Sequence, residues 1–202
     1  MLFRSGAAWD DKKNDEKRGV AETPEEEMTL IGSGSGVIIA PGYVLTNQHV
    51  IKDATKIDVL DPKDKRRKRM LPATLVASLE DPDVALLRCE NLDGDAVLLS
   101  DGTPRRGRDI MALGYPLGAR LGMVLKSSRG AIISEADPEL PMGGFLHSAT
   151  TNGGNSGGPI VDQTGRLIGL VVAVTTRNFT ENTYSIGIPT DQIWPFLKKH
   201  LP

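Results

Sequence analysis

Apolar residues occur along most of this chain in short runs that are separated by glycine, proline or polar residues. Residues 34–40 and 43–46 are two such runs on either side of Pro41-Gly42, a pattern that is typical of a β-hairpin. Runs of the same kind occupy residues 57–60, 74–78, 84–88, 109–116, 124–133, 144–149, 159–161, 167–174 and 185–188. Because these runs are short and rich in β-branched residues, we expect each of them to form a strand.

The end of the chain has a helical period instead. Ile193, Phe196, Leu197 and Leu201 recur at the spacing of one helix face, and two lysines lie near the C-terminal end, where the helix dipole favours cations. We therefore expect a helix over residues 189–202. Many short strands followed by one terminal helix favour an all-β fold built from closed barrels.

Two segments are rich in charge and poor in apolar residues. Residues 10–28 carry both signs of charge without an apolar period, so we interpret residues 1–29 as a flexible charged arm. Residues 61–69 (DPKDKRRKR) are expected to form an exposed, basic hairpin tip. A basic cluster of this kind could contact acidic lipid or nucleic acid, but a solvated loop is the simpler interpretation.

The composition narrows the class of protein. The 202 residues carry a formal net charge of −2, which gives no reason to expect nucleic acid as a partner. No run approaches the ~20 apolar residues that a membrane span needs, and the start of the chain lacks the apolar core of a signal peptide. The single cysteine, Cys89, cannot form an internal disulfide and is expected in the core. No spacing of His, Cys or carboxylates indicates a metal, and no cofactor is expected.

Three short strings carry candidate chemistry. His49 follows an apolar run in LTNQHV, and Asp83 precedes another in DPDVALL. Ser156 lies among the glycines of GGNSGGP, which can adopt φ > 0 and direct successive N–H groups toward an oxyanion. A serine hydroxyl needs a base such as histidine, and the histidine needs a carboxylate that fixes its tautomer. The order of the three residues is that of chymotrypsin-type enzymes.

TNQHV, DPDVALL and GNSGGP resemble the three active-site strings of trypsin-like serine proteases, and more narrowly those of the HtrA/DegP family. GSGVII and SIGIPTDQI also resemble that family, so the resemblance extends from about residue 32 to the end of the chain. It implies two perpendicular six-stranded antiparallel β-barrels, about residues 30–103 and 104–188, with the cleft between them. His49 and Asp83 would come from the first barrel and Ser156 from the second. The backbone N–H groups of Gly154 and Ser156 would form the oxyanion hole.

The resemblance also places a specificity pocket and a subfamily marker. Asn155 stands where digestive enzymes carry an aspartate that pairs with a newly cut N-terminus, so activation by clipping is not expected here. A loop that switches between ordered and disordered states fits better. The pocket would be formed by Thr150, Val172, Ala173 and Val174. Since none of these side chains is charged, we expect cleavage after small to medium aliphatic residues.

For the biological role the resemblance implies polypeptide substrates, in the unfolded or damaged state that quality-control proteases degrade. It suggests the bacterial periplasm or cell envelope if a leader was removed, with the cytoplasm as the alternative. Chains of the HtrA type usually continue into PDZ domains, whereas this sequence ends at Pro202, so it is either a protease domain without PDZ or the protease part of a longer protein. A trimer is an open alternative, because family members assemble through N-terminal segments.

Two rival interpretations remain at this stage. The string GNSGG also satisfies the G-x-S-x-G pattern of α/β-hydrolases, which would need His200 as base with Asp162 or Asp191 as its partner. That fold requires a helix directly after the serine, and residues 159–165 predict a short strand and a turn instead. The second rival is a catalytically silent domain that binds unfolded chains or a partner. His147 and His200 are otherwise expected to be structural.

Overall fold

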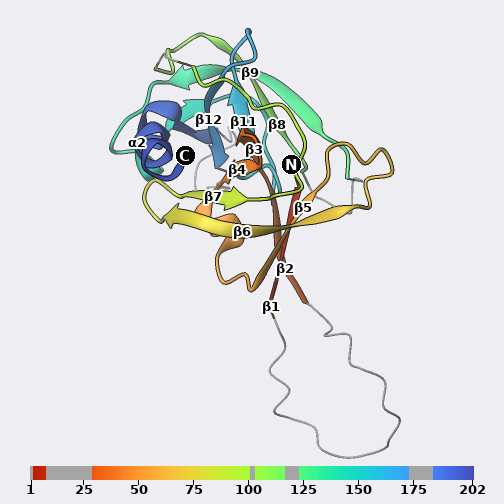
Figure 1. Cartoon of the computed structure of the whole chain (residues 1–202). Coiled ribbons are helices and arrows are strands. Elements are labelled where there is room, and N and C mark those ends of the chain that lie inside the picture. Colours follow the sequence, from red (N-terminus) through yellow and green to blue (C-terminus); the bar gives the residue numbers. More distant parts are fainter. Residues whose placement is uncertain (1, 8–28, 101–102, 117–122, 173–183) are drawn as a thin grey trace, which may run out of the picture.

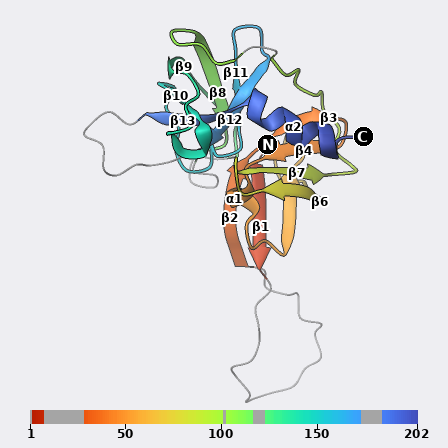
Figure 2. The same ribbon diagram turned by 90° about the vertical axis from the view of Figure 1, so that its left-hand side faces the viewer.

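The computed structural model describes residues 2–7, 29–100, 103–116, 123–172 and 184–202. Within them the chain forms two lobes of antiparallel strands, which are separated most clearly in the view of Figure 2. Figure 1 shows the C-terminal helix lying beside the strands of both lobes. The predicted all-β architecture with a terminal helix is therefore confirmed.

The first lobe is a seven-stranded sheet with the strand order β2-β1-β5-β6-β7-β4-β3. Its strands are β1 (Leu2–Ala7), β2 (Thr29–Ser35), β3 (Val37–Ala40), β4 (Tyr43–Thr46), β5 (Lys56–Leu60), β6 (Met70–Leu79) and β7 (Val84–Arg88). A short helix, α1 (Gln48–Ile51), follows β4. The two edge strands, β2 and β3, are separated in the chain only by Gly36. The sheet must therefore curl round until its two edges meet.

This first lobe differs from the expected six-stranded barrel, because its sheet has seven strands and is not a closed ladder. The additional strand is β1, which lies in the segment that the sequence assigns to a charged arm. It pairs with β5 through Phe3↔Val59 to Gly6↔Lys56, and on its other side with β2. An edge of β5 offers unpaired backbone groups, and a short extended segment satisfies them. The remainder of the expected arm, residues 8–28, lies outside the described residues.

The second lobe is a closed six-stranded barrel with the order β10-β13-β12-β11-β8-β9, as the sequence predicts. Its strands are β8 (Asp109–Gly114), β9 (Lys126–Ser134), β10 (Phe145–His147), β11 (Pro159–Val161), β12 (Leu167–Val172) and β13 (Ser185–Pro189). One turn of 3₁₀ helix, η2 (Pro141–Gly143), precedes β10. Strand β12 is buried along its whole length, because the C-terminal helix packs against it.

The hairpin β3–β4 has the turn that its sequence predicts. Val37 pairs with Leu45 and Ala40 with Tyr43, so Pro41 and Gly42 alone connect the strands. Gly42 has a φ of 73°, which is the left-handed conformation that the third position of a type II turn requires. This turn directs β4 back across the sheet and positions the segment that follows it.

The helix α2 (Thr190–His200) packs on both lobes. Ile193, Phe196 and Leu197 are buried, as the helical spacing predicts, whereas Leu201 follows the helix and is half-buried. The helix contacts β12 and β13 of the second lobe and β7 of the first. One apolar core therefore includes residues of both lobes and of the helix: Val37, Ile39, Leu45, Val84, Leu86, Leu167, Leu170, Val172, Ile186, Ile188, Ile193, Phe196 and Leu197. A shared core of this kind holds the two lobes in one relative position.

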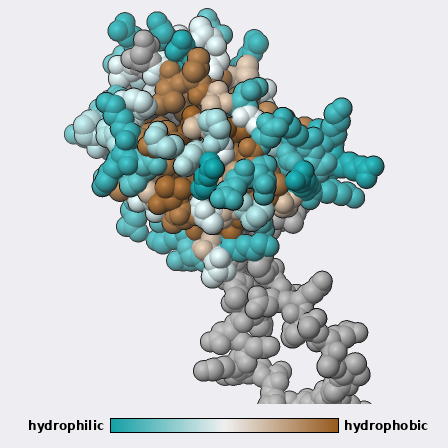
Figure 3. Space-filling view, in the orientation of Figure 1, coloured by the Kyte–Doolittle hydropathy of each residue, from teal (hydrophilic) through white to brown (hydrophobic). Residues whose placement is uncertain are grey.

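The surface mixes hydrophobic and hydrophilic side chains on the face seen in Figure 3. Single exposed apolar residues such as Leu98 and Leu125 are ordinary on folded proteins. The longest described helix has 11 residues, and no described helix is long and apolar enough to cross a membrane.

Candidate active site

His49 lies in the short helix α1, directly after the buried strand β4. The next two residues, Val50 and Ile51, are buried in the core of the first lobe and hold the helix against the sheet. The His49 side chain points outward and is 45% exposed. The buried residues after His49 therefore fix the backbone, while the exposed imidazole ring remains accessible.

Asp83 uses both carboxylate oxygens on His49. Its Oδ2 lies 2.7 Å from His49 Nδ1, and its Oδ1 accepts a hydrogen bond of 2.9 Å from the His49 backbone N–H. Because a carboxylate only accepts hydrogen bonds, Nδ1 must carry the proton, and in the neutral ring Nε2 is left as the acceptor. The structure thus brings together two residues that the sequence separates by 34 positions.

The backbone around Asp83 is held in an uncommon conformation. Asp83 has a φ of 62°, in the left-handed region that few non-glycine residues adopt. Its carbonyl accepts a hydrogen bond of 2.9 Å from Asn47 Nδ2, and its side chain is only 10% exposed. Asn47 thus connects the segment before His49 to the backbone of its carboxylate partner. Such strain at a well-supported position is frequent in functional sites.

Ser156 lies in a loop of tight turns between β10 and β11. The N–H of Asn155 donates to the carbonyl of Asn152 over 3.0 Å, which closes a turn whose third residue, Gly154, has a φ of 96°. Only glycine adopts this conformation readily. Gly157, with a φ of 78°, donates its N–H to the carbonyl of Val171 in β12 over 2.9 Å. The serine is therefore attached on its C-terminal side to β12, a fully buried strand of the barrel.

The serine loop packs directly against the segment that carries His49. A Cβ atom on Gly157 would overlap Thr46 Oγ1 and lie 2.9 Å from the Asn47 backbone nitrogen. A Cβ atom on Gly34 would lie 2.6 Å from Val50 Cγ1 and 3.1 Å from the Ser156 carbonyl oxygen. These contacts place Ser156 of the second lobe beside the His49 segment of the first. They depend on two glycines that have no side chain.

Ser35, which no sequence motif marks, joins the two lobes at this point. Its N–H donates to the Ser156 carbonyl over 2.8 Å, and its hydroxyl donates to the Gly154 carbonyl over 2.6 Å. The same hydroxyl accepts from the Tyr115 N–H over 2.9 Å, and the Ser35 carbonyl accepts from Thr46 Oγ1 over 2.7 Å. Ser35 is fully buried. No sequence signal distinguishes it from Ser33 in the same GSGSG run.

The residues expected to form a specificity pocket are only partly described. Thr150 is exposed, and Val172 is 3% exposed within the core shared by both lobes. Ala173 and Val174 lie outside the described residues. Nearby, the buried Ser185 hydroxyl donates to the Ala149 carbonyl over 3.1 Å and lies 2.7 Å from Thr151 Oγ1, which ties the segment before the serine loop to β13.

A cavity of about 890 Å³ lies elsewhere on the second lobe. It is lined by residues of the β8–β9 and β11–β12 hairpins, among them Asp109, Arg129 and Asp162, and by none of the three candidate residues. The site described above is therefore identified by its side-chain contacts and not by the size of a cavity. Among the described residues, no group of three or more His, Cys, Asp or Glu side chains could hold a metal ion.

Two further titratable groups are buried in the core. His147 in β10 is fully buried, and neither ring nitrogen has a hydrogen-bond partner among the described residues. Burial lowers its pKa to about 4. Burial also raises the pKa of the Cys89 thiol, which suits an inert core residue and not a nucleophile. Both placements agree with the structural roles expected from the sequence.

Comparisons with known proteins show which family the chain resembles. Residues 34–170 match the family model described as a trypsin-like peptidase domain. The chain is 32% identical over 178 residues to Protease Do-like 2, chloroplastic, of Arabidopsis thaliana, covering 86% of this chain and 29% of that protein. It is 33% identical over 172 residues to the probable periplasmic serine endoprotease DegP-like of Pseudomonas putida, covering 83% and 34%.

The solved structures give the same picture. The crystal structure of the serine endoprotease from Yersinia pestis has a TM-score of 0.71 to this chain at 27% identity, and covers 99% of this chain and 62% of that one. The chain spans about a third of the length of the curated relatives named above. The similarity thus concerns one part of those longer proteins.

Replacing Ser35 by alanine tests its role at the junction of the lobes. Ser35→Ala leaves the Tyr115 N–H and the Gly154 carbonyl without their buried partner, so we expect a loss of about 1–3 kcal/mol in the free energy of unfolding. Ser33→Ala, at an exposed position of the same strand, is the matched control and should change stability by less than about 0.5 kcal/mol. Urea denaturation measures both values, and equal effects in the two variants would contradict the assignment.

The buried His147 predicts a specific dependence of stability on pH. Its pKa is about 4 in the folded protein and 6.5 in the unfolded chain, so the unfolded state binds the proton first. Stability is fully present above pH ~6.5 and is lost as the pH falls toward 4, by about 2 kcal/mol between pH 7 and pH 5. His147→Leu should remove this part of the pH dependence. Denaturant titrations at both pH values measure it, and an unchanged difference in the variant would exclude the explanation.

Proposed function

The chain belongs to the trypsin-like peptidase family, and on that premise we propose that it is a serine endopeptidase with Ser156 as nucleophile, His49 as base and Asp83 as orienting group. The observation that carries this proposal is the double contact of Asp83 with the ring and the backbone of His49, at 2.7 and 2.9 Å. It leaves the other ring nitrogen free to accept a proton, on a segment that packs against the serine loop. The similarity to HtrA/DegP-type endoproteases supports the same assignment.

The proposed reaction has two halves. His49 Nε2 takes the proton of the Ser156 hydroxyl while Oγ attacks the carbonyl carbon of the scissile peptide. The tetrahedral intermediate then expels the amine, which receives that proton from His49, and an acyl-enzyme ester remains on Ser156. In the second half water replaces the serine by the same proton transfers. The carboxylic acid leaves, and the free serine is restored.

Asp83 would act through His49 in both halves. It holds the tautomer that leaves Nε2 free to accept a proton, and it stabilises the imidazolium that forms. Its second oxygen binds the His49 backbone N–H, so that the ring and the main chain are fixed by one carboxylate. The carboxylate is largely excluded from water, where its interaction with a developing charge is stronger than at the surface.

The backbone N–H groups of Gly154 and Ser156 are proposed to form the oxyanion hole. The peptide group between these two donors is fixed at both ends, because the Gly154 carbonyl accepts from Ser35 and the Asn155 N–H donates to Asn152. Fixing this peptide orients the two peptides that flank it. A donor that is already oriented needs no reorganisation when negative charge develops on the oxyanion.

The substrates are proposed to be polypeptides, in particular unfolded or damaged ones, and the role to be protein quality control. The names of relatives include periplasmic endoproteases, so we propose the periplasm or cell envelope as the location. The absence of a charged side chain at Thr150 and Val172 supports cleavage after small to medium aliphatic residues. A trimer remains a proposal on the same basis of resemblance.

Substitution of the catalytic residues tests the proposed mechanism. Ser156→Ala should lower casein hydrolysis by about 10⁶-fold and abolish labelling by a fluorophosphonate probe, because no nucleophile remains. Asp83→Asn should lower kcat by about 10⁴-fold, because the amide stabilises the wrong tautomer of His49. Ser148→Ala changes an exposed serine of the same segment and should retain activity.

The controls separate this mechanism from its rivals. Casein cleavage that persists in Ser156→Ala would show that another residue is the nucleophile. A folded wild-type protein that neither cuts casein nor reacts with the probe would instead favour the catalytically silent binder. Circular dichroism of each variant shows whether lost activity reflects lost folding.

A peptide library tests the proposed specificity. We expect cuts after Val, Ala, Ile or Leu, because an uncharged pocket gives a cationic or acidic side chain no partner that offsets its desolvation. Mass spectrometry of the products identifies the residue before each cut. A preference for Lys or Arg at that position would show that charged residues outside the described part of the chain form the pocket, and the proposal would be wrong.

A further inference from the structure

The loop between β5 and β6, residues 61–69, differs in charge from the rest of the molecule. It holds six Lys and Arg side chains and two carboxylates, a net charge of +4, so the remaining chain carries −6 of the total of −2. Figure 3 shows a hydrophilic projection on the side where this loop extends in Figure 1. We call residues 61–69 the basic loop.

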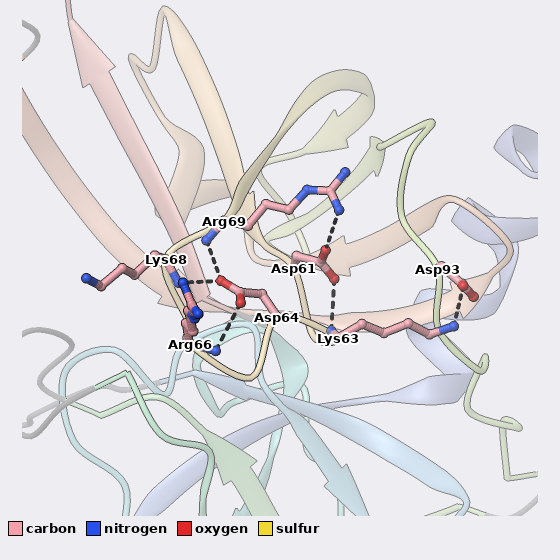
Figure 4. Close-up of polar contacts among 7 residues, drawn as sticks. All are labelled: Asp61, Lys63, Asp64, Arg66, Lys68, Arg69 and Asp93. Carbon is pink, nitrogen blue, oxygen red and sulfur yellow. Dashed lines mark hydrogen bonds and ion pairs between the residues drawn. The ribbon is translucent and has the colours of Figure 1, made fainter.

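Asp64 folds the basic loop from within. Its carboxylate accepts hydrogen bonds from the backbone N–H groups of Arg66, Lys68 and Arg69, at 2.9, 2.7 and 2.7 Å (Figure 4). These bonds hold the pKa of Asp64 below its usual value. The same turn keeps Arg67 at a φ of 56°, a conformation that a side-chain-bearing residue adopts only when its surroundings impose it. The backbone of the basic loop is therefore held in one defined conformation.

The second carboxylate of the loop is also engaged. Asp61 accepts from the Lys63 N–H over 2.8 Å and forms an ion pair of 3.4 Å with Arg69 (Figure 4). Lys63 in turn pairs with Asp93. Both acids and two of the cations are thus used to build the loop.

The other four cations of the basic loop are not used in this way. Lys65, Arg66, Arg67 and Lys68 are exposed, and none of them forms an ion pair within the described part of the chain. Holding like charges together on a short loop is unfavourable unless an anion binds there. The internal bonds of Asp64 hold the backbone that carries these four charges in place even without a ligand.

The basic loop lies next to the proposed active site. A cavity of about 270 Å³ is lined on one side by loop residues, including Lys65 and Arg67, and on the other by Tyr115 and Met123. The Arg67 charge acts on Tyr115, where it opposes the rise of the tyrosine pKa that burial causes. The Tyr115 N–H donates to the Ser35 hydroxyl, which holds the Gly154 carbonyl of the serine loop. We call this cavity the groove. A single residue, Ser35, thus connects its wall at Tyr115 to the serine loop.

We propose that the basic loop is an exosite that binds an acidic segment of the polypeptide substrate beside the cleft. This inference rests on the proposed function, because it concerns the chain that the site would cut. A polypeptide that is held at Ser156 and extends toward Tyr115 would reach the groove, where its Asp and Glu side chains would meet Lys65 and Arg67. Charge complementarity with such a segment is concentrated on this loop, which carries +4 while the rest of the chain carries a net charge of −6.

Binding to the Ser156→Ala protein tests the exosite without any need for cleavage. Two fluorescent peptides of equal length are compared, one with a run of Asp and Glu and one with Asn and Gln at the same positions. Fluorescence anisotropy should show roughly three- to ten-fold tighter binding of the acidic peptide at low salt. The difference should vanish near 1 M salt, where the screening length is about 3 Å.

A pair of double variants in the same background locates the binding site. K65Q/R67Q removes two cations of the groove and leaves Asp64 with its backbone bonds, so we expect equal affinity for both peptides. R105Q/R106Q removes the same charge from an exposed segment that precedes β8, at the opposite end of that strand from Gly114 and Tyr115. This control should keep the preference for the acidic peptide.

The possible outcomes separate the exosite from its alternatives. Equal binding of the two peptides by the parent protein, or the same loss in both double variants, would overturn the exosite. So would a K65Q/R67Q variant that binds both peptides as the parent does but loses binding to anionic lipid vesicles or to duplex DNA. A wild-type protein that binds the acidic peptide through Lys65 and Arg67 but cuts no peptide would refute the endopeptidase, and the loop would then be a peptide-binding site and not an exosite.

Discussion

The hydrogen bonds of one buried residue, Ser35, hold the serine loop of the second lobe against the first. Three of its four bonds cross between the lobes and reach Gly154, Ser156 and Tyr115. The fourth anchors Ser35 to Thr46, at the end of the strand that leads to the histidine. A buried polar group that loses its partner costs more than the bond itself contributes. The relative position of the two halves of the site is therefore coupled to the packing of the whole molecule.

Much of the fold could be predicted because local signals and tertiary structure agree. Short apolar runs became strands, Pro41-Gly42 became the hairpin turn, and the apolar face of residues 190–200 became buried. The pairing of residues 2–7 with β5 could not be predicted in this way. It depends on a sheet edge that exists only once the rest of the lobe has folded. In addition, the charged residues 10–28 that follow make the whole N-terminal segment resemble a flexible arm. The curl of the first sheet likewise follows from the order of its strands. That order cannot be predicted from any single apolar run in the sequence.

The site was predictable to the extent that its chemistry has a distinctive residue pattern. His49 and Asp83 lie in strings whose order and neighbours indicate their pairing, and the structure brings them to 2.7 Å. Ser35 has no such pattern, because Ser33 is the same residue type two positions earlier on the same strand. Only burial separates the two serines. Residues that act by positioning others are identified by their contacts, and these exist only in the folded chain.

The same reasoning applies to charge, since identical residue types serve opposite purposes in the two parts of the molecule. Asp83 gives one oxygen to a backbone N–H and the other to an imidazole, so its charge acts on the ring. Asp64 gives its carboxylate only to backbone N–H groups, so its charge shapes a loop and leaves the surrounding cations free of ion pairs with it. A count of +4 over residues 61–69 does not reveal this division. The partners of each carboxylate do, and they explain how a chain of net negative charge can present a cationic surface on one loop.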